Sequence, residues 1–85
     1  MASPLVVAAG TVYVMKPWWR PGLPALTAGG ELMVADEGRK TRKRNLVTII
    51  DLLEAGRYDD IIPEDDRLTV GRQARRWLNI IEGNQ

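Results

Sequence analysis

Residues 45–56 read NLVTIIDLLEAG, and the spacing of their apolar side chains sets the class of fold. Four apolar residues fall at positions i, i+3, i+4 and i+7, the pattern of an amphipathic helix with one buried face: Leu46, Ile49, Ile50 and Leu53. Gly56 follows at a position where helices often end on a left-handed residue. The sequence therefore predicts a helix over residues 45–55.

A second helix is predicted over residues 70–81. A second apolar stripe at helical spacing runs through this segment, made of Val70, Ala74, Trp77, Leu78 and Ile81. Thr69 has the side chain of an N-cap, and Gly83 is placed to end the helix. Three arginines fall on the opposite side of this helix: Arg72, Arg75 and Arg76.

The chain before residue 37 reads as β-structure. Residues 11–16, TVYVMK, are rich in β-branched and aromatic types, and Pro17 ends the run. We expect residues 31–35, ELMVA, to be their antiparallel partner, which predicts a hairpin over residues 11–36. Residues 1–10 contain a short apolar run that is either an edge strand of the same sheet or an arm that pairs with a neighbouring subunit.

The sequence thus predicts one small α+β domain over residues 1–85, a small antiparallel hairpin or sheet followed by two amphipathic helices. The chain has 85 residues, of which 45% are hydrophobic and 27% charged, a composition typical of globular proteins. Its N-terminal apolar run is too short for a secretory signal or a membrane span. We expect the protein in a virion or in the host cytoplasm.

The composition excludes several classes of chemistry. The chain has no Cys and no His, so it has no disulfide, no thiolate zinc site and no thiol nucleophile, and it lacks the commonest general base. Ser3 is the only serine and gives no nucleophile–base pair. We therefore expect a protein that is not an enzyme and needs no cofactor or metal.

A basic run directly precedes the first predicted helix. Residues 39–44 carry five cations in six positions: Arg39, Lys40, Arg42, Lys43 and Arg44. A helix N-terminus favours Asp or Glu, so local stability does not explain these cations. The run is either a solvated loop or a site for an external anion, which would be a nucleic-acid phosphate or a carboxylate cluster on a partner protein.

An acidic run follows the first predicted helix. It consists of Asp59, Asp60, Glu64, Asp65 and Asp66, without the ligand spacing of a calcium loop. About 12 helical residues separate the two runs by roughly 18 Å, so they cannot easily neutralise each other within one molecule. Copies placed head to tail could pair them, and such contacts build rings or open filaments.

Two adjacent tryptophans form a third candidate contact. Side chains alternate along an extended segment, so one of Trp18 and Trp19 is expected either to be exposed beside Arg20 or to be covered by something other than the core. Tryptophan is enriched at interaction hot spots, which makes these three residues candidate partner-binding residues together with the basic and acidic runs. If the arginines of the second helix join residues 39–44 on one surface, that surface would suit nucleic acid.

The order of these segments resembles a known kind of module. Residues 12–18, VYVMKPW, precede a glycine-containing turn, residues 30–34, GELMV, and a helix that closes with residues 52–57, LLEAGR. This order, over roughly residues 11–62, is similar to small modules encoded among the head and neck genes of tailed bacteriophages. The basic run and the C-terminal helix depart from that pattern. The resemblance implies a virion structural or head-associated protein with no catalytic residues to carry over.

Our leading hypothesis is therefore a non-enzymatic assembly protein, a bacteriophage virion component such as a head decoration, neck or connector-associated subunit. It would work as a homo- or hetero-oligomer held by charge complementarity and by an aromatic or apolar contact. Two alternatives stay open: a small nucleic-acid-binding regulator, and an inhibitor that masks a host protein.

Overall fold

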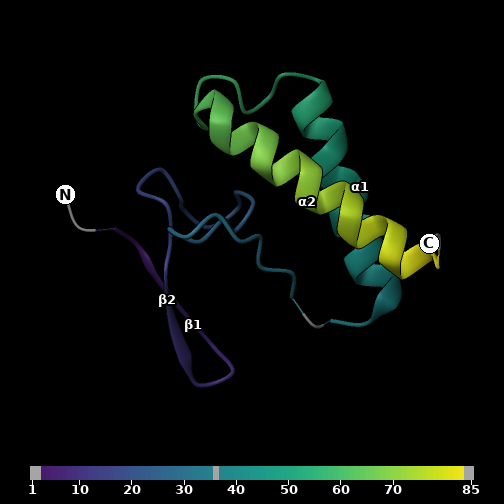
Figure 1. The fold of residues 1–85 in the computed structure, drawn as a ribbon, viewed down its shortest axis with the longest axis horizontal. Helices are drawn as coiled ribbons and strands as arrows, with labels where there is room; N and C mark the ends of the chain where they lie inside the picture. The colour runs from purple at the N-terminus through teal and green to yellow at the C-terminus, as the bar shows by residue number, and fades with distance from the viewer. Residues whose placement is uncertain (1–2, 36, 84–85) are drawn as a thin grey trace.

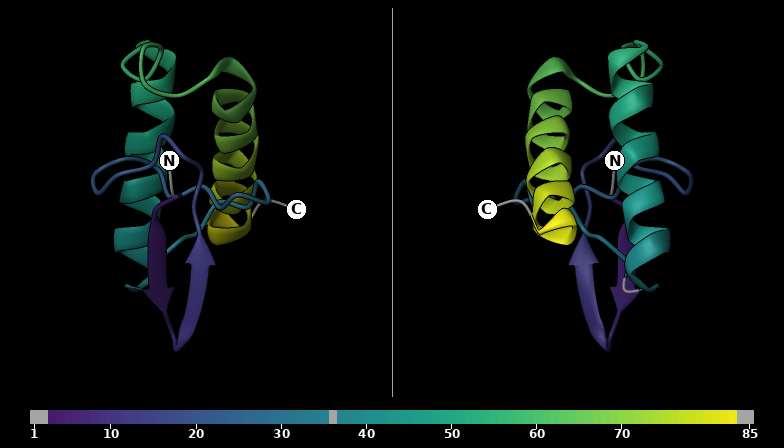
Figure 2. Two further views of the ribbon diagram at one scale, coloured as in Figure 1. Left: turned by 90° about the vertical axis from the view of Figure 1, so that its left-hand side faces the viewer. Right: turned by 90° about the vertical axis from the view of Figure 1, so that its right-hand side faces the viewer.

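The computed structural model describes residues 3–35 and 37–83, and it confirms the α+β class (Figure 1). Its elements are β1 (Leu5–Ala8), β2 (Thr11–Val14), α1 (Arg39–Glu54) and α2 (Glu64–Glu82). The two helices lie side by side and run antiparallel, while the strands form a hairpin that projects away from them (Figures 1 and 2). Residues 15–35, which we call the connecting segment, have little regular structure and lie between the hairpin and the helices.

The hairpin closes through a two-residue loop. β1 and β2 pair antiparallel, with Leu5 opposite Val14 and Ala8 opposite Thr11. Both loop residues have positive φ, 51° at Ala9 and 79° at Gly10. Positive φ at both positions belongs to the hairpin turns whose twist matches that of the flanking strands.

The predicted hairpin over residues 11–36 was wrong in its pairing. Residues 11–14 pair with residues 5–8, and Leu32 forms an isolated bridge with Leu26 instead of pairing with β2. Directly after β2, Met15 forms an isolated antiparallel bridge with Thr27, so Thr27 lies beside the end of β2. Closing two residues costs less chain entropy than closing about a dozen, so the local partner is favoured. The sequence reading did not recognise this turn because an alanine occupies its first loop position.

Both helices begin one to two turns earlier than predicted. α1 starts at Arg39 and so includes the basic run, and α2 starts at Glu64 with Pro63 as its N-cap. Thr69 is therefore not the N-cap; its hydroxyl donates to the Asp65 carbonyl at 3.0 Å within the helix. The first turns of both helices are charged and have no apolar residues at helical spacing, so the hydrophobic pattern of the sequence did not predict them.

The predicted helix ends are confirmed. Gly56, with φ of 73°, directly follows the last α1 cap residue, and Gly83, with φ of 76°, is the left-handed C-cap of α2. Both glycines occupy a conformation that side-chain-bearing residues rarely adopt.

The core lies between the two helices and the connecting segment. Its buried residues come from all three: Leu26, Leu32, Leu46, Ile50, Val70, Ala74 and Ile81. Within the described chain, no Cα atom of either strand comes within 8 Å of a Cα atom of either helix. The hairpin therefore lies outside this core and is attached to it through the connecting segment.

We expect Leu26→Ala to lower the free energy of unfolding by about 2–5 kcal/mol, because it opens a cavity at a fully buried position. The matched control is Leu68→Ala on α2, where 63% of the leucine is exposed and the loss should stay below about 0.5 kcal/mol. Urea unfolding followed by circular dichroism compares the two variants. Equal losses would contradict the core described above.

Candidate interaction surface

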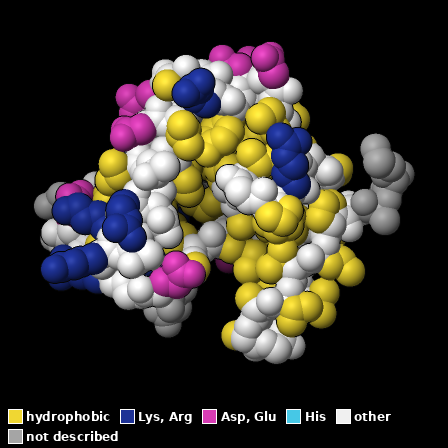
Figure 3. All heavy atoms as spheres, turned by 180° about the vertical axis from the view of Figure 1, so that it is seen from behind, with side chains coloured by type: hydrophobic (Ala, Val, Ile, Leu, Met, Phe, Trp, Pro, Cys, Tyr) yellow, Lys and Arg dark blue, Asp and Glu magenta, His cyan; other side chains and the backbone are white. Residues whose placement is uncertain are grey.

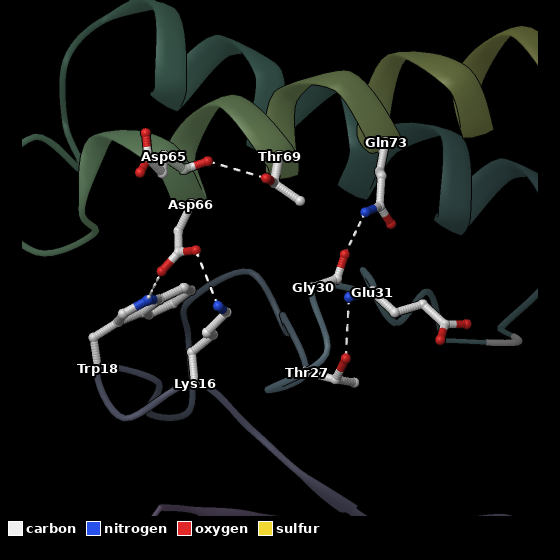
Figure 4. A network of polar contacts seen from close by, with 9 residues as sticks. All are labelled: Lys16, Trp18, Thr27, Gly30, Glu31, Asp65, Asp66, Thr69 and Gln73. Atoms are coloured by element: carbon white, nitrogen blue, oxygen red, sulfur yellow. Dashed lines mark hydrogen bonds and ion pairs between the residues drawn. The ribbon is translucent and has the colours of Figure 1, made fainter.

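One face of α2 holds the connecting segment through polar side chains (Figure 4). Asp66 uses both carboxylate oxygens: Oδ2 accepts from the Trp18 indole Nε1 at 2.8 Å, and Oδ1 lies 3.3 Å from Lys16 Nζ. Both partners come from the chain that follows β2. The carboxylate therefore fixes the start of the connecting segment against the N-terminal turn of α2.

Gln73 lies two turns further along the same face. Its Oε1 accepts from the Leu32 backbone N–H at 2.8 Å, and its Nε2 donates to the Gly30 carbonyl. The Gln73 side chain thus provides the two hydrogen bonds that a neighbouring strand would otherwise provide to the backbone of Gly30 and Leu32. Buried backbone groups need such partners, so this side chain is part of what makes the burial of Leu32 favourable.

Of the two tryptophans, Trp18 packs against the core and neither is left exposed. Trp18 and Trp19 are both half-buried, and the Trp19 indole donates to the Leu23 carbonyl at 3.2 Å. Residues 17–18 form a turn, closed by a 3.0 Å hydrogen bond from the Trp19 N–H to the Lys16 carbonyl. Because the segment is not extended, alternation does not apply to it. Both indoles have intramolecular partners, and Arg20 beside them is exposed.

The basic run lies beside the C-terminus of α2, because the two helices are antiparallel. The Arg39 guanidinium donates to the Ile81 carbonyl, and Lys43 Nζ lies 3.3 Å from Glu82 Oε2. The C-terminus of a helix carries partial negative charge and favours cations. The inference that local stability cannot explain the run was thus wrong for Arg39 and Lys43, which stabilise the end of the neighbouring helix.

Two other cations of the run face solvent. Lys40 and Arg44 are exposed and one turn apart, and neither side chain forms a hydrogen bond or ion pair with another described residue. Arg42 is half-buried, and its Nε atom is buried without a hydrogen-bond partner among the described residues. The basic run therefore offers an external anion fewer free cations than its sequence suggests.

The arginines of α2 do not contact the basic run. Arg75 Nη2 lies 3.6 Å from Glu54 Oε1 at the far end of α1. Arg72 and Arg76 line a shallow depression together with Glu31 and Trp77. Within the described residues, no hydrogen bond or ion pair connects these three arginines to residues 39–44. The structure gives them separate surroundings.

The acidic run lies at the other end of the helical pair from the basic run, as predicted. Glu64, Asp65 and Asp66 form the first turn of α2, where negative charge is favoured. Asp59 lies in the turn between the helices, and its Oδ1 is 3.7 Å from Arg67 Nε. In the same turn, burial raises the pKa of the Tyr58 hydroxyl. Helix stability accounts for much of this run without an external partner.

The feature that sequence reasoning missed is one face of the hairpin. The register places four large apolar side chains on the same side of the two strands, Leu5, Val7, Val12 and Val14, which we call the outer hairpin face. Their exposed fractions are 62%, 70%, 58% and 47%. Figure 3 shows hydrophobic side chains gathered over the projecting hairpin. The alternation of the strands could have indicated this face once the partner of β2 was known.

The opposite face of the hairpin lines a groove. Val6, Ala8 and Tyr13 lie on one side of a space of about 580 Å³, and Met33 and Trp77 lie on the other. A hollow between the hairpin and the helices is visible in Figure 3. Among the described residues that line the groove, Glu31 alone is charged. The hairpin is therefore apolar on both faces.

Among residues 3–35 and 37–83, no group of three or more Asp and Glu side chains is placed to hold a metal ion. Neither α1 nor α2 combines the length and the apolar character that crossing a bilayer requires. Comparison of the chain with known protein families, characterised proteins and solved structures gave no match.

We expect Gln73→Leu to lower the free energy of unfolding by about 1–3 kcal/mol, because it leaves the Leu32 N–H and the Gly30 carbonyl without partners. Asn79→Leu, at an exposed position of the same helix, is the matched control and should change stability by less than about 0.5 kcal/mol. Urea unfolding measures both. A Gln73→Leu variant as stable as the parent protein would refute the stabilising role of the two Gln73 hydrogen bonds.

A second pair of variants tests the role of the basic run. Arg39→Ala removes the contact with the α2 C-terminus and should cost about 1 kcal/mol at low salt. Lys40→Ala removes the same charge from a position without such a contact, and should be neutral or slightly stabilising because it relieves repulsion within the run. Thermal unfolding at low and high salt separates the two. Equal effects would show that Arg39 contributes only its charge.

Proposed function

We propose that this chain is a non-enzymatic assembly protein that binds another protein subunit through its hairpin, as a structural component of a bacteriophage virion. The observation that carries the proposal is the outer hairpin face. Four large apolar side chains there are 47–70% exposed, on an element that lies outside the core. Contiguous apolar surface of this kind marks interaction sites on soluble proteins.

The hairpin lacks the packing that a two-stranded sheet needs to be stable. Two strands of four residues are marginally stable in water without a third strand or a packed face. Among residues 3–35 and 37–83, the outer hairpin face is largely open to solvent. Covering it removes apolar surface from water at about 25 cal/mol per Å², which favours association. A partner subunit would supply both the cover and the missing packing.

The charges support an oriented contact. The basic and acidic runs lie at opposite ends of the helical pair, and residues 3–15 carry no charged side chain. Charged rims around an apolar contact set orientation and association rate more than affinity. This pattern suits a subunit that docks in one orientation in a particle.

The assignment to a virion rests on the resemblance of residues 11–62 to head and neck modules of tailed bacteriophages. A head decoration, neck or connector-associated subunit fits that resemblance. Each of these roles requires binding surfaces and no catalytic site. The nucleic-acid alternative is weaker, because Arg39 and Lys43 have partners within the chain.

Site-specific cross-linking tests the proposal in the cells or particles that contain the protein. A photoreactive residue at Val12, on the outer hairpin face, should yield an adduct with a protein that mass spectrometry identifies as a virion subunit, this chain included. The control position is Asp51, exposed in the last turn of α1, where we expect little or no adduct.

Two outcomes would contradict the proposal. Absence of any protein adduct at Val12 would refute an interaction through the hairpin. An adduct with a host enzyme alone would replace the virion role by that of an inhibitor that masks a host protein.

A further inference from the structure

The outer edge of β1 is open. The sheet contains β1 and β2 only, so β1 has a partner on one side and none on the other within the described chain. The second strand differs, because the Val14 carbonyl accepts from the Ala28 N–H at 2.8 Å and so occupies part of the far edge of β2. The free side of β1 is the longer unoccupied edge of the hairpin.

The direction of the free backbone groups follows from the ladder. The Met15 N–H donates to the Pro4 carbonyl at 2.9 Å, so Pro4 and Met15 are a hydrogen-bonded pair. The two-residue loop makes Ala8 and Thr11 a hydrogen-bonded pair as well. Antiparallel ladders alternate between hydrogen-bonded and non-hydrogen-bonded pairs. Leu5 and Val7 therefore direct their N–H and C=O groups away from β2. No backbone hydrogen bond from the described loops and turns reaches these groups.

This edge is short but lacks the charges, prolines and bulges that discourage strand addition. Natural edge strands carry charges, prolines or bulges that discourage pairing with another chain. Leu5–Ala8, LVVA, has no charged residue, no proline and a regular register with β2. Pro4 precedes the strand and lies outside the four residues.

We propose that β1 pairs antiparallel with β1 of a second copy of this chain, giving a four-stranded sheet in the order β2–β1–β1–β2. This inference rests on the proposed function, since it names the partner of the hairpin. A twofold axis through Val6 would pair Leu5 with Val7 of the second copy and satisfy the outward groups of both. No like charges meet, because the strand is uncharged. The joined sheet exceeds the three strands that independent stability requires.

Proline substitutions give a matched test. Val7→Pro removes an outward N–H of β1 and leaves the β1–β2 ladder intact, because that N–H does not take part in it. Val12→Pro removes an outward N–H on the far edge of β2 and takes an equivalent side chain from the outer hairpin face. Sedimentation equilibrium of the purified full chain should show a dimer, whose dissociation constant rises about tenfold or more in Val7→Pro and little in Val12→Pro.

A second measurement does not depend on proline tolerance. The chain has no cysteine, so Val6→Cys introduces a unique thiol at the proposed twofold axis. Opposed residues in a non-hydrogen-bonded pair have Cα atoms about 4.5 Å apart, within the range that a disulfide spans. Mild oxidation should give a disulfide-linked dimer in Val6→Cys and none in Thr11→Cys, whose position on β2 is remote from that axis.

Each outcome decides the inference separately from the proposed function. A protein that stays monomeric at all concentrations, or equal weakening by the two prolines, overturns β1 pairing, and equal weakening indicates that the outer hairpin faces stack instead. A monomer that still cross-links through Val12 to a different protein overturns only the pairing of two copies. In that case the assembly role stands.

Discussion

The contacts of Asp66 and Gln73 with the connecting segment are the interactions on which the rest of the fold depends. Residues 15–35 form no helix or strand of their own, yet they bring Leu26 and Leu32 into the core. A buried loop is stable only when its backbone groups find partners. Gln73 supplies a donor and an acceptor to the turn, and Asp66 anchors Trp18 and Lys16. These contacts hold the connecting segment against the helices, and the hairpin projects from that segment.

The antiparallel helical pair explains most of the charge pattern. Part of each charged run lies beside a helix end of opposite partial charge: Glu64, Asp65 and Asp66 at the N-terminus of α2, and Arg39 and Lys43 beside its C-terminus. The clusters therefore have a structural role before any partner is considered. What remains for an external anion is the exposed pair of Lys40 and Arg44, which is small for nucleic-acid binding, where several phosphate contacts share the affinity.

The hairpin contrasts with this internally satisfied body. The helices and the connecting segment share one core, and among their described side chains the Arg42 Nε atom alone is buried without a hydrogen-bond partner, whereas the hairpin leaves apolar side chains and an unpaired strand edge in solvent. Both are deficits that another polypeptide can correct, the first by packing and the second by hydrogen bonding. The hairpin joins the core through the connecting segment alone, so association through it would not require rearrangement of the helices. That division between a self-sufficient body and an incomplete projection is what favours an assembly role.

The local pattern of residues determined the helices, their glycine C-caps and the absence of cysteine and histidine chemistry, because helical period and composition are properties of neighbouring residues. It did not determine the partner of β2, since strand pairing depends on which loop closes at lower cost, and Ala9 gave no turn signal. Nor did it assign Trp18, Arg39 or Gln73 their roles, because their partners lie more than 40 residues away along the chain. The tertiary structure decided these points by placing α2 against both the connecting segment and the first turn of α1. The exposure of Leu5, Val7, Val12 and Val14 followed in the same way, from the register of two strands and from a core that formed without them.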